Sequence, residues 1–107
     1  MIQIFLKMFS ATMIGAIVGY ERTLSKKHAG IRTHSLLCLA TCSLTLLSEA
    51  MIPSETMRVI SGIVQGVGFL GAGVIFKGMN KSSVSGLTSS VILWLVAVIG
   101  IICGTSY

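Results

Sequence analysis

Four long runs of hydrophobic residues follow one another along the chain, separated by short polar segments. The runs cover residues 4–20, 35–52, 59–76 and 87–104. Each is just long enough for a helix to cross the hydrocarbon core of a bilayer, which needs about 20 apolar residues. The runs lack the alternation of membrane strands, and four strands cannot close a barrel. The pattern predicts an all-α membrane protein: a compact bundle of four transmembrane helices that forms one domain over residues 1–107.

Composition supports the membrane assignment. Only 10% of the 107 residues are charged and 53% are hydrophobic, whereas about 25% of a soluble domain is charged. A soluble domain this small could not cover its surface with polar groups, and disordered chains are poor in apolar residues. The three cysteines lie inside the apolar runs, which argues against a disulfide framework. The lipid bilayer is therefore the expected environment of this chain.

The basic residues predict an orientation. Segment 21–34 holds four Lys or Arg residues and segment 77–86 holds two, against Lys7 and Arg58 on the other side. Cytoplasmic loops carry the excess of basic residues, so we expect both segments in the cytoplasm and both termini outside. The net charge of +5 is spread between the runs rather than along one face, so no nucleic-acid partner is expected.

Small residues predict close helix packing, because they let backbones approach in lipid. The first and fourth runs carry small residues at spacing four, and we expect the five glycines of the third to admit neighbours on two sides. A break or re-entrant turn over 66–73 is the alternative. These small residues are Ala11, Gly15, Gly19, Gly62, Gly66, Gly68, Gly71, Gly73, Gly100 and Gly104.

A polar stripe marks one face of the second predicted helix. It consists of His34, Cys38, Thr41, Thr45 and Ser48, whose spacing of three and four keeps them on one face. We expect this stripe to face the bundle, where it either lines a polar path or bonds to its own helix. Gln65, in mid-membrane, should find a partner in the stripe, and Trp94 should fill volume beside the glycine-rich helix.

Candidate chemistry is sparse. The chain has no Asp, and Glu21, Glu49 and Glu55 stand at membrane edges. No nucleophile–base set can be assembled, so we expect a non-enzymatic protein with no catalytic residues and no cofactor. His34, Cys38 and Cys42 follow at i, i+4 and i+8, but the outer two lie too far apart to share an ion. No metal site is expected.

The edge at segment 21–34 is the most informative part of the chain. Glu21 and Arg22 end the first run, while Arg32 and Thr33 precede the second. Either these residues only anchor the helices at the interface, or Glu21 pairs with Arg32 or Arg22 at the mouth of the bundle. Arg32 is the preferred partner, because it begins the second helix where the first one ends.

Four ordered blocks resemble the MgtC/SapB family of bacterial inner-membrane proteins. They are GYER at 19–22, AGIRTH at 29–34, GVGFLGAGVI at 66–75 and GLT at 86–88, which Trp94 follows. Arg58 stands at the family's distance before the glycine block. The candidate functional residues are Glu21, Arg22, Gly30, Arg32, Thr33, Arg58, Gln65, Gly66, Gly68, Phe69, Gly71, Gly73 and Trp94.

The resemblance implies a multi-pass plasma-membrane protein with its N-terminus outside. Family members are linked to growth in low magnesium and to virulence, and some are thought to bind and restrain other membrane proteins. The resemblance adds no catalytic residues. Family members usually continue into a fifth helix and often a cytoplasmic domain. We therefore expect a regulator whose partners include other membrane proteins. We also expect copies of the chain to associate as a homo-oligomer. The alternative is a small ion or solute transporter, of magnesium or of the multidrug-exporter type.

Overall fold

The structure, a computed structural model, describes residues 1–26, 29–78 and 86–105, which form four long helices. The helices are α1 (Ile2–Leu24), α2 (Ile31–Met51), α3 (Thr56–Gly78) and α4 (Leu87–Gly104), and a 3-10 turn, η1 (Pro53–Glu55), joins α2 to α3. All four are long and apolar enough to cross a membrane. The predicted all-α fold is confirmed. The first three helices extend beyond their apolar runs, because a helix continues past the point where its side chains turn polar.

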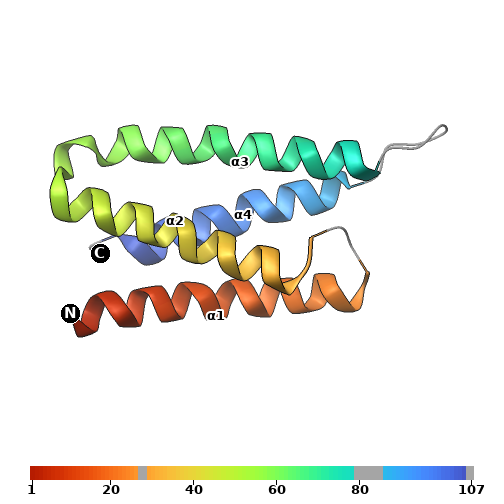
Figure 1. Cartoon of the computed structure of the whole chain (residues 1–107), viewed down its shortest axis with the longest axis horizontal. Coiled ribbons are helices and arrows are strands. Elements are labelled where there is room, and N and C mark those ends of the chain that lie inside the picture. Colours follow the sequence, from red (N-terminus) through yellow and green to blue (C-terminus); the bar gives the residue numbers. More distant parts are fainter. Residues whose placement is uncertain (27–28, 79–85, 106–107) are drawn as a thin grey trace.

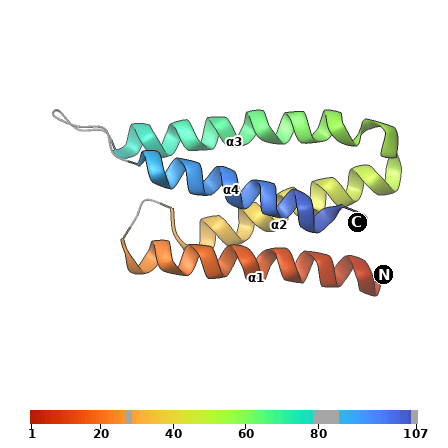
Figure 2. The same ribbon diagram turned by 180° about the vertical axis from the view of Figure 1, so that it is seen from behind.

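The bundle is flat. Its extents are 49 × 26 × 16 Å, and α1 and α3 lie on opposite sides of the central α2 and α4 (Figures 1 and 2). The end of α1 and the end of α3 lie at the same end of the bundle (Figure 1), as expected for two loops on one side of a membrane. Lys27, His28 and Lys81, three of the residues in those segments, lie outside the described residues.

The core forms around the polar stripe of α2. His34, Cys38 and Thr45 have no exposed surface, while Thr41 and Ser48 retain 3% and 8%. The prediction that this stripe faces the bundle is confirmed. The Thr41 hydroxyl donates a hydrogen bond to the carbonyl oxygen of Cys38, and the Thr45 hydroxyl donates one to the carbonyl oxygen of Thr41. Two of the stripe's hydroxyls therefore bond to their own helix.

Glycines of α1 and α4 bring these helices against α2. A Cβ atom added at Gly15 would lie 2.5 Å from the His34 carbonyl oxygen. At Gly104 the added atom would lie 2.6 Å from the Cys42 carbonyl oxygen. Both distances are shorter than van der Waals contact, so these positions have no room for a side chain. The predicted small-residue packing is confirmed on these two helices.

The glycines of α3 do not follow that pattern. α3 is one continuous helix over the glycine block, so the alternative of a break does not occur. Of the five glycines within residues 62–73, only Gly71 meets a neighbour, the Ser90 side chain of α4. An added Cβ would meet nothing within 4 Å at the other four positions, which are Gly62, Gly66, Gly68 and Gly73. The expectation of close neighbours on two sides was wrong, because α3 is an edge helix of a flat bundle.

Two further expectations about helix interiors are corrected. Gln65 is exposed on α3 and does not reach the stripe of α2. Trp94, which was expected to fill volume beside the glycine-rich helix, is 47% exposed on α4. Leu93, one residue earlier, is 1% exposed and fills the core instead. Hydropathy cannot separate such neighbours, because both are apolar and only the rotation of the helix decides which one points inward.

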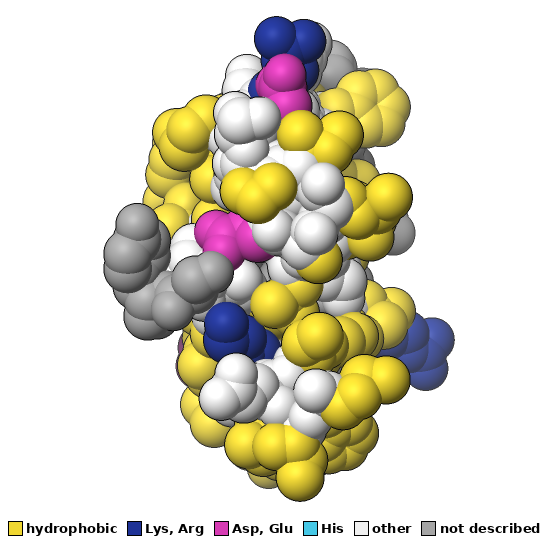
Figure 3. Space-filling model, turned by 90° about the vertical axis from the view of Figure 1, so that its left-hand side faces the viewer, with side chains coloured by type: hydrophobic (Ala, Val, Ile, Leu, Met, Phe, Trp, Pro, Cys, Tyr) yellow, Lys and Arg dark blue, Asp and Glu magenta, His cyan; other side chains and the backbone are white. Residues whose placement is uncertain are grey.

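The surface of the molecule suits lipid. Figure 3 views the end of the bundle that carries both termini, where a few basic and acidic groups lie among hydrophobic and neutral surface. Large exposed side chains elsewhere include Phe5, Ile17 and Phe69, which is 80% exposed. Exposed apolar groups on every helix would be costly in water, and they match the hydrocarbon of a bilayer.

Candidate functional site at the α1–α2 turn

The turn between α1 and α2 is held by a side chain from the last turn of α1. The Thr23 hydroxyl oxygen accepts a 2.8 Å hydrogen bond from the Ile31 amide and so satisfies one free donor at the start of α2. Gly30 precedes α2, and a Cβ atom there would collide with the Thr23 hydroxyl. Ala29 is 2% exposed. The small residues of the AGIRTH block therefore let the chain reverse against the end of α1.

Arg22 lies inside the bundle rather than at its surface. The residue is 6% exposed, and its Nη2 donates a 2.9 Å hydrogen bond to Ser89 Oγ in the first turn of α4. Nη1 lies 3.4 Å from Glu21 Oε1, on a carboxylate that is 63% exposed. A buried guanidinium requires such partners, because its charge is costly away from water. Arg22 thus joins the ends of α1 and α4.

His34 is the second buried polar residue at this end. Its Nδ1 donates a 2.8 Å hydrogen bond to the Gly30 carbonyl oxygen, and its Cβ packs where Gly19 leaves room on α1. Within the described part of the chain, His34 Nε2 and Arg22 Nε are buried without a hydrogen-bond partner. The nitrogen–carbonyl contact requires a proton on Nδ1. His34 therefore supports the turn from within, as Thr23 does from the end of α1.

Among the described residues, Glu21 forms an ion pair with Arg22 and not with Arg32. Glu21 Oε2 accepts a 2.8 Å hydrogen bond from the Ser25 hydroxyl, in addition to its contact with Arg22. Arg32 is exposed, and no ion pair among the described residues joins it to Glu21. The sequence placed both groups at the membrane edge, and Arg32 lies exposed in the first turn of α2.

The residues of the first two blocks divide into two groups. Gly19, Arg22, Gly30 and His34 hold the helices together through close approaches and buried hydrogen bonds. Glu21, Arg32 and Thr33 are exposed at the same end. The first group explains why the chain folds in this way. The second group lies on the surface at this end of the bundle.

The other candidate residues lie elsewhere. Arg58 is at the opposite end of α3, where its Nε lies 2.9 Å from Glu55 Oε2. Gln65, Gly66, Gly68, Phe69 and Gly73 are exposed along α3, and Gly71 faces α4. The structure therefore brings Glu21, Arg22 and Gly30 together but leaves the glycine block as a separate surface.

Sequence reasoning missed two residues of this site. Ser89 is 2% exposed and accepts a hydrogen bond from Arg22. Thr23 accepts a hydrogen bond from the first amide of α2 and so caps that helix. A polar residue in the first turn of an apolar span was the available signal for Ser89. As for metals, no group of three or more His, Cys, Asp or Glu side chains that could hold an ion occurs within residues 1–26, 29–78 and 86–105.

The MgtC family model matches residues 8–107, which include both the α1–α2 turn and the glycine block. The chain belongs to the MgtC family. Its fold, four candidate spanning helices, is that of a multi-pass membrane protein.

Individual relatives agree with the MgtC assignment. The chain is 40% identical to Protein MgtC of Salmonella typhimurium over 92% of this chain and 42% of the relative. It is 35% identical to Protein SapB of Bacillus subtilis, over 97% and 48% respectively. An uncharacterized protein of Haemophilus influenzae is 37% identical, over 97% and 48%. The chain thus spans about half the length of these relatives, and no solved structure matches it.

Proposed function

We propose that this MgtC-family chain is a non-enzymatic regulator that binds other membrane proteins in the bacterial plasma membrane. The observation that carries the proposal is that α1 and α4 cover the polar stripe of α2. Gly15 of α1 and both Gly100 and Gly104 of α4 place backbone directly against it. The hydroxyls of Thr41 and Thr45 are used within α2. A transport pathway needs polar groups that face a passage, whereas these groups face packed helices.

The binding surface is the exposed part of the α1–α2 turn. Arg32 and Thr33 lie exposed beside a turn that buried contacts hold in place, and Glu21 shares that end. An arginine can engage a carboxylate through two hydrogen bonds. The partner is therefore a membrane protein with acidic groups at its cytoplasmic edge. The link to magnesium-limited growth and to virulence rests on the family resemblance.

Affinity purification of the tagged chain from bacterial membranes tests this function. We expect a defined membrane protein to be retained by the wild type and depleted at least about tenfold by Arg32→Gln, the loss of one charge-assisted contact. Lys26→Gln is the matched control, since it removes an equally exposed cation outside the AGIRTH block. Equal recovery with all three chains would contradict the proposal. Saturable magnesium uptake by vesicles that contain the purified chain would favour the transporter alternative.

The proposed orientation places the α1–α2 turn in the cytoplasm and both termini outside. Ser54 in η1 and Ser25 at the end of α1 are exposed at opposite ends of the bundle. A membrane-impermeant thiol reagent added to intact spheroplasts should label Ser54→Cys and not Ser25→Cys. The native cysteines give the background, and permeabilised cells supply the control in which both variants react. Labelling of position 25 from outside would contradict this orientation and indicate the reverse one.

A further inference from the structure

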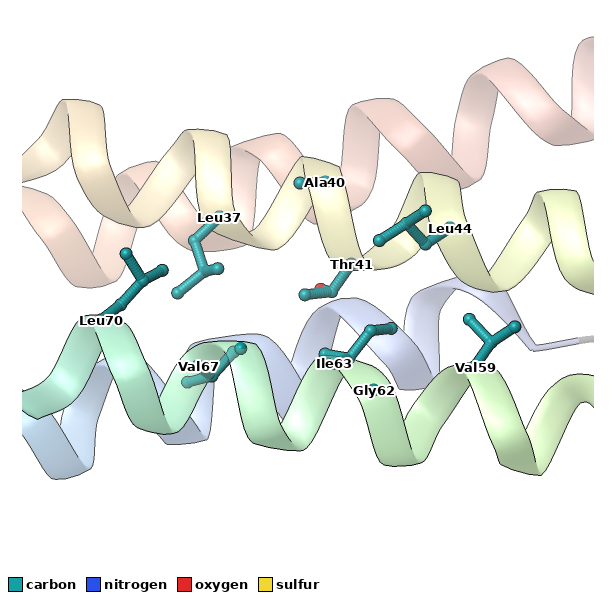
Figure 4. A pocket seen from close by; sticks show the side chains of 10 residues that line it. Leu37, Ala40, Thr41, Leu44, Val59, Gly62, Ile63, Val67 and Leu70 are labelled. Carbon is teal, nitrogen blue, oxygen red and sulfur yellow. The ribbon is translucent and has the colours of Figure 1, made fainter.

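A groove runs between α2 and α3, starting at η1. The two helices meet at η1 and diverge from there (Figure 1), and they leave between them a groove of about 430 Å³. Figure 4 shows Leu37 and Leu44 of α2 across this groove from Val67 and Leu70 of α3. A second hollow of about 210 Å³ shares Leu44 and Val59 with the first and reaches η1. We call the two hollows together the α2–α3 groove.

Small residues keep the α2–α3 groove open. Ala40 of α2 and both Gly62 and Gly66 of α3 line it, and a Cβ atom added at either glycine would meet nothing within 4 Å. Thr41 also lines the groove, but its hydroxyl donates a hydrogen bond to the Cys38 carbonyl oxygen of its own helix. A ligand in the groove would therefore meet apolar surface, which disfavours a polar solute and suits hydrocarbon.

The α2–α3 groove is about as long as one leaflet of a bilayer. From Val59 to Leu70 its lining rises about 16 Å along α3, and half of a hydrocarbon core of about 30 Å is about 15 Å. Glu55 precedes Val59 and lines the groove at η1, where the chain turns between two candidate spans. In a membrane, one end of the groove would lie at the surface and the other near the middle of the bilayer, as do the two ends of an acyl chain.

The volume of the groove fits an acyl chain rather than a helix. A helix about 10 Å across would fill about 1,200 Å³ over that length, whereas the larger hollow measures about 430 Å³. A helix could therefore cover the groove but could not lie within it, while a narrow and flexible acyl chain can follow it. In lipid, burial of hydrocarbon does not by itself favour binding, so the head group must supply the selectivity.

The surface end of the groove carries one negative and one positive group. Glu55 lines the groove, and its Oε2 lies 2.9 Å from Nε of Arg58, whose side chain is 83% exposed. The phosphate of a phospholipid can accept hydrogen bonds from the terminal nitrogens of Arg58, and an ammonium group can donate to the Glu55 carboxylate. A zwitterionic head group therefore complements this pair. A head group without an ammonium would place its phosphate beside a carboxylate of like charge.

We propose that the α2–α3 groove binds one phospholipid of the phosphatidylethanolamine type. One acyl chain lies between α2 and α3, the phosphate accepts hydrogen bonds from Arg58, and the ammonium group donates to Glu55. The bound lipid fills the space that the diverging helices leave and so stabilises the position of α3 at the edge of the bundle. The head-group end lies at η1, opposite the exposed α1–α2 turn (Figure 1), so this inference does not depend on the proposed function.

Native mass spectrometry of the purified full chain, titrated in detergent with phosphatidylethanolamine, tests the site. We expect one lipid to bind more tightly than all later ones. Gly62→Leu should weaken its binding at least about tenfold, because the new side chain enters the groove. Gly68→Leu is the matched control, since it also faces open space but does not line the groove. Equal affinities of the two variants would overturn the proposal.

Exchange of the head group tests the ionic part of the site in the same titration. Phosphatidylcholine has an ammonium without N–H donors, and phosphatidylglycerol has none, so the wild type should prefer phosphatidylethanolamine at least about fivefold. Glu55→Gln should remove most of this preference, and Arg58→Gln should weaken the binding of all three lipids. Lys26→Gln, which removes an exposed cation at the other end of the bundle, should change neither. Equal affinity of the wild type for the three lipids contradicts the assigned head group.

Photo-crosslinking of the wild-type chain in vesicles does not depend on how any variant folds. A trace of phosphatidylethanolamine with a diazirine near the methyl end of one acyl chain should label Leu37 and Leu70, at the mid-membrane end of the groove. The same group near the glycerol should label Leu47 and Val59, close to η1. Ile17, 67% exposed on α1, gives the level for ordinary surrounding lipid. Groove labelling at that level, or labelling that ignores the diazirine position, would refute a bound lipid.

Discussion

Glycines at helical spacing have opposite surroundings in two regions of this bundle. On α1 and α4 they lie against the backbone and side chains of α2, with no room for a Cβ atom. On α3, four of the five glycines within residues 62–73 face open space. The difference comes from position in a flat bundle, because α2 and α4 are central and α3 is at an edge (Figure 1). The same residue pattern therefore indicates close packing inside the chain in one region and an available surface in the other.

The largest effect should follow from filling a glycine in the closed region. A Cβ atom at Gly100 would overlap Thr41 Oγ1 and lie 2.5 Å from the Cys38 carbonyl oxygen. We expect Gly100→Ala to lower the free energy of unfolding by about 3 kcal/mol, as overpacked cores do. Thermal unfolding in detergent micelles would measure the loss. Gly68→Ala in the open region should be neutral or stabilising by up to about 1 kcal/mol, and equal losses would remove the distinction between the regions.

The next effect concerns the polar contact that joins α1 to α4. Ser89→Ala would remove the acceptor of the 2.9 Å hydrogen bond from Arg22 and leave that buried cation short of a partner. We expect a loss of about 2 kcal/mol in the free energy of unfolding, read from the same thermal assay. Ser61→Ala, on the exposed side of α3, should change it by less than about 0.5 kcal/mol. Identical midpoints for the two variants would show that Arg22 does not need Ser89.

Gly71 tests the boundary between the two regions on α3 itself. Among the glycines within residues 62–73 it is the one that faces α4, where the Ser90 side chain stands in the way of an added Cβ. Gly71→Leu should cost about 1–2 kcal/mol, because the obstacle is a small side chain rather than backbone. Gly73→Leu, two residues on and facing open space, serves as the reference. If folded protein accumulates equally for both variants, α3 does not pack on α4 at this point.

The smallest effect is expected at Trp94. Since Trp94 is 47% exposed and Leu93 is 1% exposed, Trp94→Leu should change the free energy of unfolding by less than about 1 kcal/mol. Leu93→Ala should cost about 3 kcal/mol through the cavity that it leaves. Denaturation of both purified variants in one detergent would compare them directly. A larger loss for Trp94→Leu would show that the tryptophan fills volume beside the glycine-rich helix, as the sequence predicted.

Much of the fold could be predicted because hydropathy reports it directly. The run at 87–104 coincides with α4, and the apolar length of each segment defines a span. The α2 stripe was predictable because it contrasts in polarity with its own helix. By comparison, Gln65 and Trp94 were misplaced because each is a single residue with no such contrast around it. Of the two predicted partners of Glu21, the sequence favoured Arg32 over Arg22, because side-chain direction at a helix end is not encoded in sequence spacing.

The sequence by itself determined four membrane-spanning helices, the inward face of α2 and membership of the MgtC family. These properties follow from apolar length, helical period and ordered blocks, all of which lie along the chain. Only the tertiary structure decided that Arg22 is buried against Ser89 and that α3 exposes its glycines. Such outcomes depend on how helices rotate and which ones become neighbours. In lipid, apolar surface is as well satisfied outside the bundle as inside it, so hydrophobicity cannot decide which face of a helix is buried.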